Sequence, residues 1–280
     1  ILHINDLHHH LADFSRIAGR IRELRTQHQD DPNTAILAMS AGDDIIGSPF
    51  DELLGSDPDS FSLHPAYRLY SAAGIDISVL GNHDLDLGTE ILAKGIQQDA
   101  RFPVLSANLK NTPELEGLYY PAALFITKGI RVGVIGLTTF AQVRQPLNSN
   151  LEIANPVSVL QNILPAIRPF CDVIIVLSHL GYSRKTRTVS APNEWGGDVE
   201  LAQTLPKGSI DLIVGGHTHH ALNQDSVSAN NIVNGIPIVQ AGSFGDFVGE
   251  VHISLKKNLI SVESASLTPT GNLAIYEKFQ

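Results

Sequence analysis

The sequence contains a single cysteine, Cys171, so it cannot form an intrachain disulfide. A chain of 280 residues with 43% hydrophobic content does not need one, because it can bury a full core. The sequence also lacks any run of roughly 18 consecutive apolar residues, the length that a membrane-spanning helix requires. Its longest apolar stretches are interrupted by Gly, Asp, Ser or His. We therefore expect a soluble protein without membrane insertion.

Basic residues are scarce as well. The 19 Lys and Arg residues are outnumbered by 29 Asp and Glu residues, which gives a formal net charge of −10. Such a balance leaves no basic face for a duplex, and we expect no nucleic-acid partner. A small phosphate-containing molecule would meet the same repulsion unless its site were locally positive. A bound metal would satisfy that requirement.

The visible sequence begins at Ile1, within an apolar stretch. Neither an initiator Met nor the charged and apolar segments of a secretory signal are visible there. The sequence by itself therefore assigns no compartment, and it assigns no oligomeric state.

Strand-like and helix-like patterns alternate along the chain. Short apolar runs rich in β-branched residues suit strands that are covered on both faces; they occupy residues 1–5, 35–41, 77–80, 103–107, 173–178 and 211–216. Apolar residues return at helical spacing between them, at 14–27, 66–74 and 157–170. The pattern is typical of an α/β protein.

Two further regions, 122–139 and 235–255, have the pattern of antiparallel strands. The first contains a Lys128-Gly129 turn, and the second is followed by another strand-like run at 259–267. We found no internal repeat. The predicted fold class is therefore α/β, a four-layer α/β/β/α sandwich with mixed sheets.

Polar side chains follow five of the predicted strands, at the point where each strand ends. They are Asp6 and His8, then Asp43, then Asn82 and His83, then His179, and finally His217 and His219. In open α/β sheets, ligands bind outside the carboxyl ends of the strands. We therefore expect these side chains to converge at one edge.

The residue types and their spacing indicate a metal centre. Asp6 and His8 are two residues apart, as are His217 and His219, so each pair would point to one side of an extended backbone and share a cation. Imidazole and carboxylate ligands without thiolate suit Mn²⁺, Zn²⁺, Fe²⁺ or Co²⁺ in an open site. Seven ligands exceed the needs of one such ion but suit two ions about 3.5 to 4 Å apart that share a carboxylate. Asp43 is the natural bridge.

Five strings, in order along the chain, carry a family resemblance: ILHINDLH, GDDIIGSP, GNHDLDLG, SHLGY and GGHTHH. They resemble the catalytic domain of the 5′-nucleotidase and 2′,3′-cyclic phosphodiesterase family, within the calcineurin-like metallophosphoesterases. The resemblance implies two metal sites, one held by Asp6, His8, Asp43 and His219 and the other by Asp43, Asn82, His179 and His217. It also implies that His83 acts on the substrate, paired with Asp86.

By this resemblance the chain is a two-metal hydrolase of nucleotides or related small phosphate esters, either a phosphomonoesterase or a cyclic phosphodiesterase. Two alternatives stay open: a hydrolase of the same fold that acts on a sulfur oxyanion ester, and a module that binds phosphate through metal without cleaving it. A module that only binds phosphate would not explain why both His83 and Asp86 are present. The family also implies a periplasmic or extracellular location, with the cytoplasm as the alternative because no signal peptide is visible.

Familiar members of this family carry a second, C-terminal domain that supplies phosphate-binding arginines and two aromatic rings for the nucleobase. The sequence stops at Gln280, so we expect residues 1–280 to form one catalytic domain without that second domain.

Other residues would then contact the substrate. One candidate is the loop after His179, which includes Arg184, Lys185 and Arg187 for phosphate and Trp195 for an aromatic leaving group. A solvated surface loop is the alternative. His9 replaces a residue that is often small in the family, so it either narrows the pocket and touches substrate or is a bystander.

Overall fold

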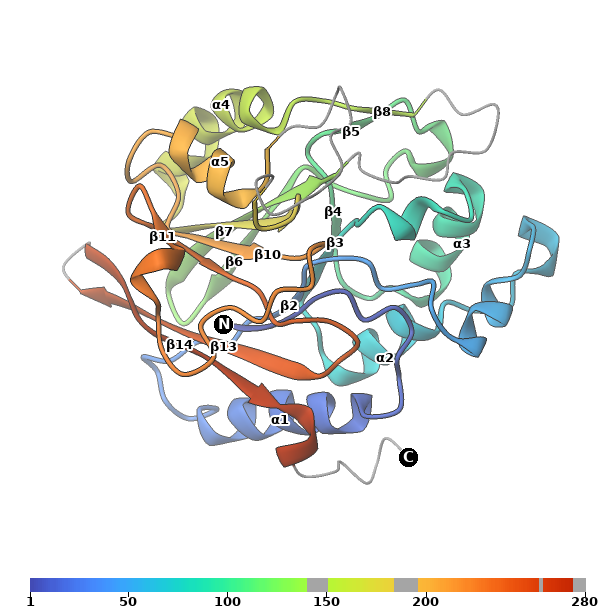
Figure 1. Ribbon diagram of the computed structural model, residues 1–280, viewed down its shortest axis with the longest axis horizontal. Helices are drawn as coiled ribbons and strands as arrows, with labels where there is room; N and C mark the ends of the chain where they lie inside the picture. The colour runs from blue at the N-terminus through green and yellow to red at the C-terminus, as the bar shows by residue number, and fades with distance from the viewer. Residues whose placement is uncertain (140–150, 184–195, 257–258, 274–280) are drawn as a thin grey trace.

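Two six-stranded sheets stack face to face at the centre of the protein (Figure 1). The computed structural model describes residues 1–139, 151–183, 196–256 and 259–273. The first sheet has the strand order β14-β13-β1-β2-β3-β4. Its strands are β1 (Leu2–Ile4), β2 (Ala38–Ser40), β3 (Ile77–Val79), β4 (Val104–Leu105), β13 (Phe247–Lys256) and β14 (Leu259–Pro269).

The second sheet has the order β11-β12-β10-β9-β7-β6. Its strands are β6 (Ala122–Thr127), β7 (Ile130–Thr138), β9 (Val173–His179), β10 (Leu212–Gly215), β11 (Ile232–Val233) and β12 (Ile236–Val239). A separate antiparallel pair consists of β5 (Leu109–Lys110) and β8 (Glu152–Ile153).

Both sheets are parallel at the centre and antiparallel toward their edges. Strands β1 to β4 run parallel to one another, as do β7, β9, β10 and β12. The outer strands β13, β14, β6 and β11 pair antiparallel with their neighbours. The carboxyl ends of the parallel strands therefore lie together at one edge of each sheet.

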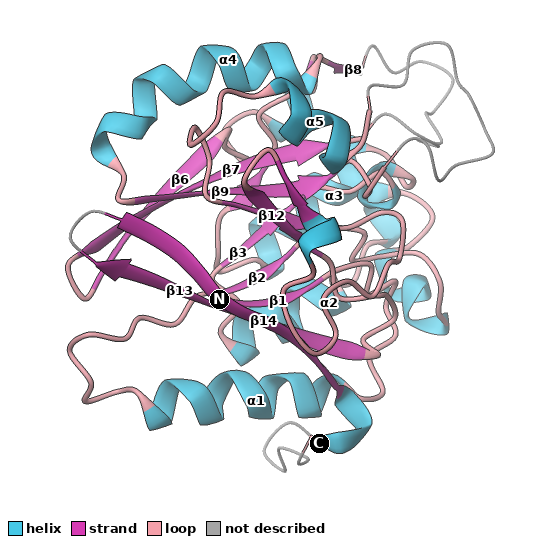
Figure 2. Ribbon diagram, turned by 60° about the vertical axis from the view of Figure 1, so that its left-hand side comes forward, coloured by secondary structure: helices cyan, strands magenta, loops and turns pink. Residues whose placement is uncertain are grey.

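Helices cover the outer face of each sheet, as Figure 2 shows. The first sheet is covered by α1 (Phe14–Gln27), α2 (Pro65–Ala73) and α3 (Thr89–Asp99), and the second by α4 (Pro156–Ile167) and α5 (Asp198–Thr204). Short 3₁₀ helices occur at Pro49–Leu54, Pro58–Ser60, His83–Leu85, Pro113–Leu115, Arg168–Phe170, Ala229–Asn231 and Thr270–Asn272. In the described part of the chain, no helix is long and apolar enough to cross a membrane.

The helix ends follow from local sequence signals. Helix α2 begins with Pro65, and the His64 ring accepts a hydrogen bond from the Tyr67 N–H, which would otherwise lack a partner in the first turn. It ends at Ala73 and is capped by Gly74, whose φ of 83° is the left-handed conformation that glycine adopts without strain. Helix α4 begins after Asn155, whose side chain accepts hydrogen bonds from two N–H groups of the first turn.

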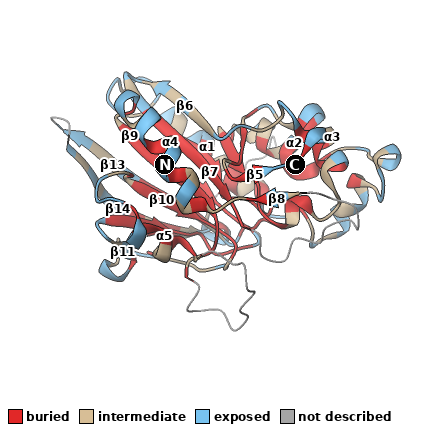
Figure 3. Ribbon diagram, turned by 90° about the horizontal axis from the view of Figure 1, so that it is seen from above, coloured by how far each residue is buried: buried red, intermediate tan, exposed pale blue. Residues whose placement is uncertain are grey.

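Three apolar cores hold the layers together. The first lies between the helices and the first sheet and includes Phe14 and Tyr70. The second lies between the sheets and includes Met39 and Ile175, and the third, around Leu160, joins the second sheet to α4 and α5. In Figure 3 the central strands are largely buried, whereas the helices are partly exposed. The predicted four-layer α/β/β/α architecture with mixed sheets is confirmed.

The prediction for residues 235–255 needs a correction. It placed this region in antiparallel strands, but β12 and β13 do not pair with each other: β12 belongs to the second sheet and β13 to the first. The chain changes sheets at a turn around Phe244, between Gly242 and Gly245, which have φ values of 75° and 74°. Helices α3 and α5 were absent from the predicted elements.

Candidate metal centre

The candidate ligands come from five parallel strands in the middle of the two sheets. Asp6 and His8 follow β1, Asp43 follows β2 and Asn82 follows β3, all in the first sheet. In the second sheet His179 is the last residue of β9, and the pair His217 and His219 follows β10. Because both sheets end at the same side, these residues meet between the two sheets.

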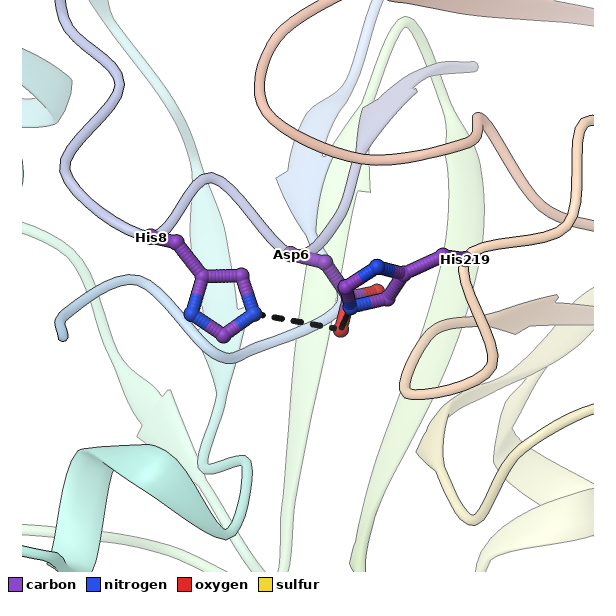
Figure 4. Close-up of side chains that lie close together, drawn as sticks. All are labelled: Asp6, His8 and His219. Atoms are coloured by element: carbon purple, nitrogen blue, oxygen red, sulfur yellow. Dashed lines mark ion pairs between the residues drawn. The ribbon is translucent and has the colours of Figure 1, made fainter. Parts of the chain in front are cut away.

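One cluster of possible ligands consists of Asp6, His8 and His219. One ligand atom from each lies within 4.8 Å of the others. The His219 Nε2 atom is 3.2 Å from Asp6 Oδ1, and His8 Nε2 is 4.0 Å from the same oxygen. Figure 4 shows both imidazole rings directed at the carboxylate of Asp6. This arrangement suits one cation held between the three side chains.

A second cluster consists of Asp43, His179 and His217, again within 4.8 Å of one another. His179 Nε2 is 3.0 Å from Asp43 Oδ2, and His8 Nε2 of the first cluster is 3.9 Å from the same oxygen. Asp43 therefore faces both clusters, as a bridging carboxylate must.

Asn82 adds an unpartnered polar side chain. It is fully buried, yet neither its Oδ1 nor its Nδ2 atom has a hydrogen-bond partner in the described part of the protein. The next residue, His83, donates its backbone N–H to Asp43 Oδ1 at 2.8 Å, which places Asn82 beside the second cluster. A buried amide without partners is costly, and a cation would satisfy its oxygen.

The outer ring atoms of two histidines fix which nitrogen faces the clusters. His179 Nδ1 is 2.6 Å from the Ala41 carbonyl, and His8 Nδ1 is 2.7 Å from the Ile46 carbonyl. Because a carbonyl only accepts, each neutral ring must donate from Nδ1 and keep its lone pair on Nε2. Nε2 is the atom that points at the carboxylates, so both rings are set up as metal ligands.

The negative charge of two buried carboxylates also favours the binding of cations at this site. Asp6 and Asp43 are almost fully buried, and neither pairs with Lys or Arg among the residues described. Burial lowers the pKa of His179, but the adjacent Asp43 and Asp6 carboxylates outweigh it and raise that pKa to about 10. The pocket therefore favours positive charge, and divalent ions would replace the proton. The donor set of carboxylates, imidazoles and one amide fits such ions.

The backbone of these ligands is strained. Five of the candidate ligands have positive φ values between 47° and 74°: Asp6, His8, Asp43, His217 and His219. Such conformations cost about 1–3 kcal/mol each in non-glycine residues and gather at functional sites. The prediction of extended backbone is therefore wrong for both pairs. The prediction that His217 and His219 share a cation is also wrong, because the two residues belong to different clusters. The left-handed bends, rather than strand alternation, aim the side chains.

His83 and Asp86 form a hydrogen-bonded pair at the cleft. His83 Nδ1 is 2.6 Å from Asp86 Oδ2, and this bond raises the pKa of His83 despite its partial burial. Asp84, the residue after His83, instead accepts backbone N–H groups of Asp43, Asp44 and Gly81.

A family model for calcineurin-like phosphoesterases matches residues 1–221, most of the chain. The chain belongs to this family. A 5′-nucleotidase of Vibrio cholerae is 30% identical over 97% of the chain and 51% of its own length. The chain thus spans about half the length of such curated relatives.

Solved structures of related proteins agree with the phosphoesterase fold. A 5′-nucleotidase precursor of Thermus thermophilus matches 99% of the chain and 56% of its own with a TM-score of 0.75 and 25% identity. The sulfate thiohydrolase SoxB of the same organism matches 95% of the chain and 44% of its own with a TM-score of 0.73. At 20% identity this last likeness shows the fold alone.

The phosphoesterase cleft has a volume of about 610 Å³. It is lined by His8, His10, Asp43, Ile46, Gly47, His83, His217, Thr218, His219, His220 and Phe244. His9 is absent from this lining: it is fully buried, with Nδ1 2.5 Å from Asp51, so the expectation that it narrows the pocket is wrong. The geometric reason is that His9 turns under the loop at Asp51, while His10 reaches the cleft.

Two lining residues, His10 and Phe244, were missed by the sequence reasoning. The glycines on either side of Phe244 are a local signal of a turn, but no local signal shows that its ring faces the ligands. The predicted substrate residues Arg184, Lys185, Arg187 and Trp195 lie outside the described residues.

Proposed function

We propose that this chain is a two-metal phosphoester hydrolase that acts on nucleotides or closely related small phosphate esters. The observation that carries the proposal is the pair of ligand clusters joined at Asp43, with the His83–Asp86 pair at the same cleft. The similarity to 5′-nucleotidases supports the nucleotide substrate.

The residues divide into ligands and one proton-handling group. Asp6, His8, Asp43 and His219 would hold one ion, and Asp43, Asn82, His179 and His217 the other. When bound, such ions neutralise charge on the phosphoryl oxygens and lower the pKa of a water that attacks phosphorus. Mn²⁺, Zn²⁺, Fe²⁺ and Co²⁺ all suit these oxygen and nitrogen donors.

His83 would act on the leaving oxygen. Asp86 accepts the Nδ1 proton, which fixes the orientation of the ring and leaves Nε2 for the substrate. In its protonated form, His83 would donate the Nε2 proton to the oxygen that leaves phosphorus. A module that only binds phosphate has no use for this pair, which favours the hydrolase over the binding alternative.

The deciding experiment begins with protein purified without chelator. We expect metal analysis to find about two ions per chain. We also expect either the release of phosphate from AMP or the opening of 2′,3′-cyclic AMP to adenosine monophosphate. Dialysis against a chelator should abolish release, and added Mn²⁺, Zn²⁺, Fe²⁺ or Co²⁺ should restore it. Phosphate release that survives complete metal removal would refute the proposal, and cleavage of sulfur esters alone would favour the sulfur-oxidation alternative.

Two broader points belong to the same proposal. The resemblance supports a periplasmic or extracellular location, which fractionation of cells can test. We also propose that residues 1–280 act as one catalytic domain. Support comes from the packing, because the core between the two sheets contains residues from Leu37 to Ala265.

A further inference from the structure

An exposed aromatic side chain borders the cleft beside the ligands. Phe244 lies in the turn between β12 and β13, and 41% of its surface is exposed. Its ring centroid is 5.6 Å from that of His8 and 5.3 Å from that of His219. The ring therefore adjoins the first ligand cluster and faces the same cleft.

The conformation of Phe244 is unfavourable for folding alone. Its φ is 58°, in the left-handed region that aromatic residues rarely adopt. Its N–H donates a hydrogen bond to the Asp6 carbonyl at 2.8 Å, which ties the strained turn to the strand end that carries a ligand. The strained turn holds an apolar ring that remains partly exposed to water in the cleft. Outliers of this kind are typical of ligand sites.

His10 extends this aromatic surface. Its side chain is exposed, and its ring centroid lies 4.5 Å from that of Phe244 at an angle of 37°. Both rings line the cleft. We call Phe244 and His10 the aromatic step.

The aromatic step lies in the same cleft as His83, the residue that would meet the leaving oxygen. The His8 ring is flanked by His83 at 5.2 Å and by Phe244 at 5.6 Å. A substrate whose leaving oxygen meets His83 therefore has the rest of its leaving group within reach of Phe244. In a nucleoside monophosphate that group ends in a planar base, which stacks on aromatic rings.

We propose that the aromatic step binds the base of a nucleoside monophosphate by stacking on Phe244, and so makes nucleotides better substrates than sugar phosphates. This inference rests on the proposed function and deepens it, because it assigns the substrate class to two residues of this chain. Stacking needs only a planar face, so both purine and pyrimidine nucleotides should bind more tightly through Phe244. Purines should gain more because their planar surface is larger.

The test compares AMP with ribose 5-phosphate, which presents the same phosphate ester without a base. We expect the wild type to prefer AMP in kcat/KM, and Phe244→Leu to reduce that preference about tenfold, mainly by raising KM for AMP. Phe244→Trp should keep it. Phe170→Leu is the matched control, since Phe170 is 63% exposed and lies outside the cleft; it should not change the preference.

Three results would overturn the inference. An unchanged preference in Phe244→Leu would show that the ring does not contact the base. An equal loss for both substrates, together with lost metal, would show that the ring only supports the histidine ligands. A wild type that cleaves both substrates equally well would leave the hydrolase intact and remove the stacking. If AMP, ribose 5-phosphate and 2′,3′-cyclic AMP are all left uncleaved, the proposed function itself is removed. Saturation-transfer NMR with adenosine, where Phe244→Leu should weaken the signal of the base protons, gives a readout independent of turnover.

Discussion

Aspartates at the amino ends of the parallel strands and aspartates at the carboxyl ends of other parallel strands lie in opposite environments. At the amino ends of β3, β9 and β10, an aspartate directly precedes each strand. Each of these carboxylates lies 2.6 Å from a guanidinium nitrogen, in the pairs Asp76 with Arg25, Asp172 with Arg131, and Asp211 with Arg168. Each also accepts a backbone N–H, from Ala38, Arg131 and Ile174. The charge at this end is balanced within the protein.

At the carboxyl ends, Asp6 and Asp43 are more deeply buried, and within the described residues they face imidazoles and N–H groups instead of arginines. Burying a carboxylate without a fixed positive partner is expensive. The same residue type is therefore paired with arginine at one end. At the other end its charge is not balanced by arginine, and it forms part of a candidate cation site. Four substitutions test this contrast.

The largest effect is expected for Asp43→Asn. Loss of the carboxylate that faces both clusters should reduce the metal content below two ions per chain. It should also raise the activation barrier by several kcal/mol, which lowers kcat/KM roughly a thousandfold or more. Metal analysis and phosphate release from AMP measure the two effects. Asp211→Asn, at the opposite strand end, is the control and should keep its metal. If both variants lose metal alike, the contrast between the two ends is wrong.

His83→Ala separates chemistry from metal binding. His83 lies beside the ligands, but its ring pairs with Asp86, so its loss should leave metal content near that of the wild type. Turnover should fall by about 10²- to 10⁴-fold, the contribution of a positioned acid or base. Asp86→Asn should show a smaller loss of the same kind. A variant that loses metal in step with activity would place His83 among the ligands instead.

Asp84→Asn tests how the strained loops are held. The Asp84 carboxylate accepts the N–H groups of Asp43 and Asp44 after β2 and of Gly81 after β3, at 2.8 to 3.1 Å. An amide accepts through one oxygen and turns an NH₂ group toward these donors. Metal affinity should fall about 10- to 100-fold, as for other groups that orient ligands.

The matched control is Asp57→Asn, because Asp57 also accepts two backbone N–H groups but lies exposed at a 3₁₀ helix. Titration of each metal-free variant with Mn²⁺ gives the affinities. Equal affinities for Asp84→Asn and the wild type would show that the loops hold their shape without this carboxylate.

The sequence predicted the strand ends well because hydrophobic periodicity and polar residues after strands are local signals. Helix α1 was predicted with the bounds that the structure has. Each ligand group contains three of the four residues that the family resemblance implies for one metal site. The family is confirmed, while the roles of individual site residues stay proposals.

What escaped prediction depends on backbone geometry and on partners distant in sequence. Positive φ at His8 turns the next residue, His9, into the interior and brings His10 to the cleft, and no local pattern distinguishes these three histidines. Phe244 reaches the ligands because its turn joins two different sheets, and its N–H bonds to Asp6, which is far away in the sequence. The two-residue hydrophobic periodicity of a strand predicts neither the positions of His9 and His10 nor that of Phe244.

The smallest effect belongs to Arg131→Ala, at the amino ends. The hydrogen bond from Arg131 lowers the pKa of Asp172 from its usual 3.8 to about 2, and both side chains face water, where an ion pair contributes little. Because the folded-state pKa is depressed, the contribution is fully present above pH 3.8 and is lost as the pH falls toward 2. Urea unfolding of metal-free protein should thus show a slightly less stable variant at pH 7 and a smaller difference near pH 3. Metal content and AMP hydrolysis should equal those of the wild type. If the variant loses either one, the two strand ends are coupled, and the contrast between the arginine-paired aspartates and those at the candidate metal centre is wrong.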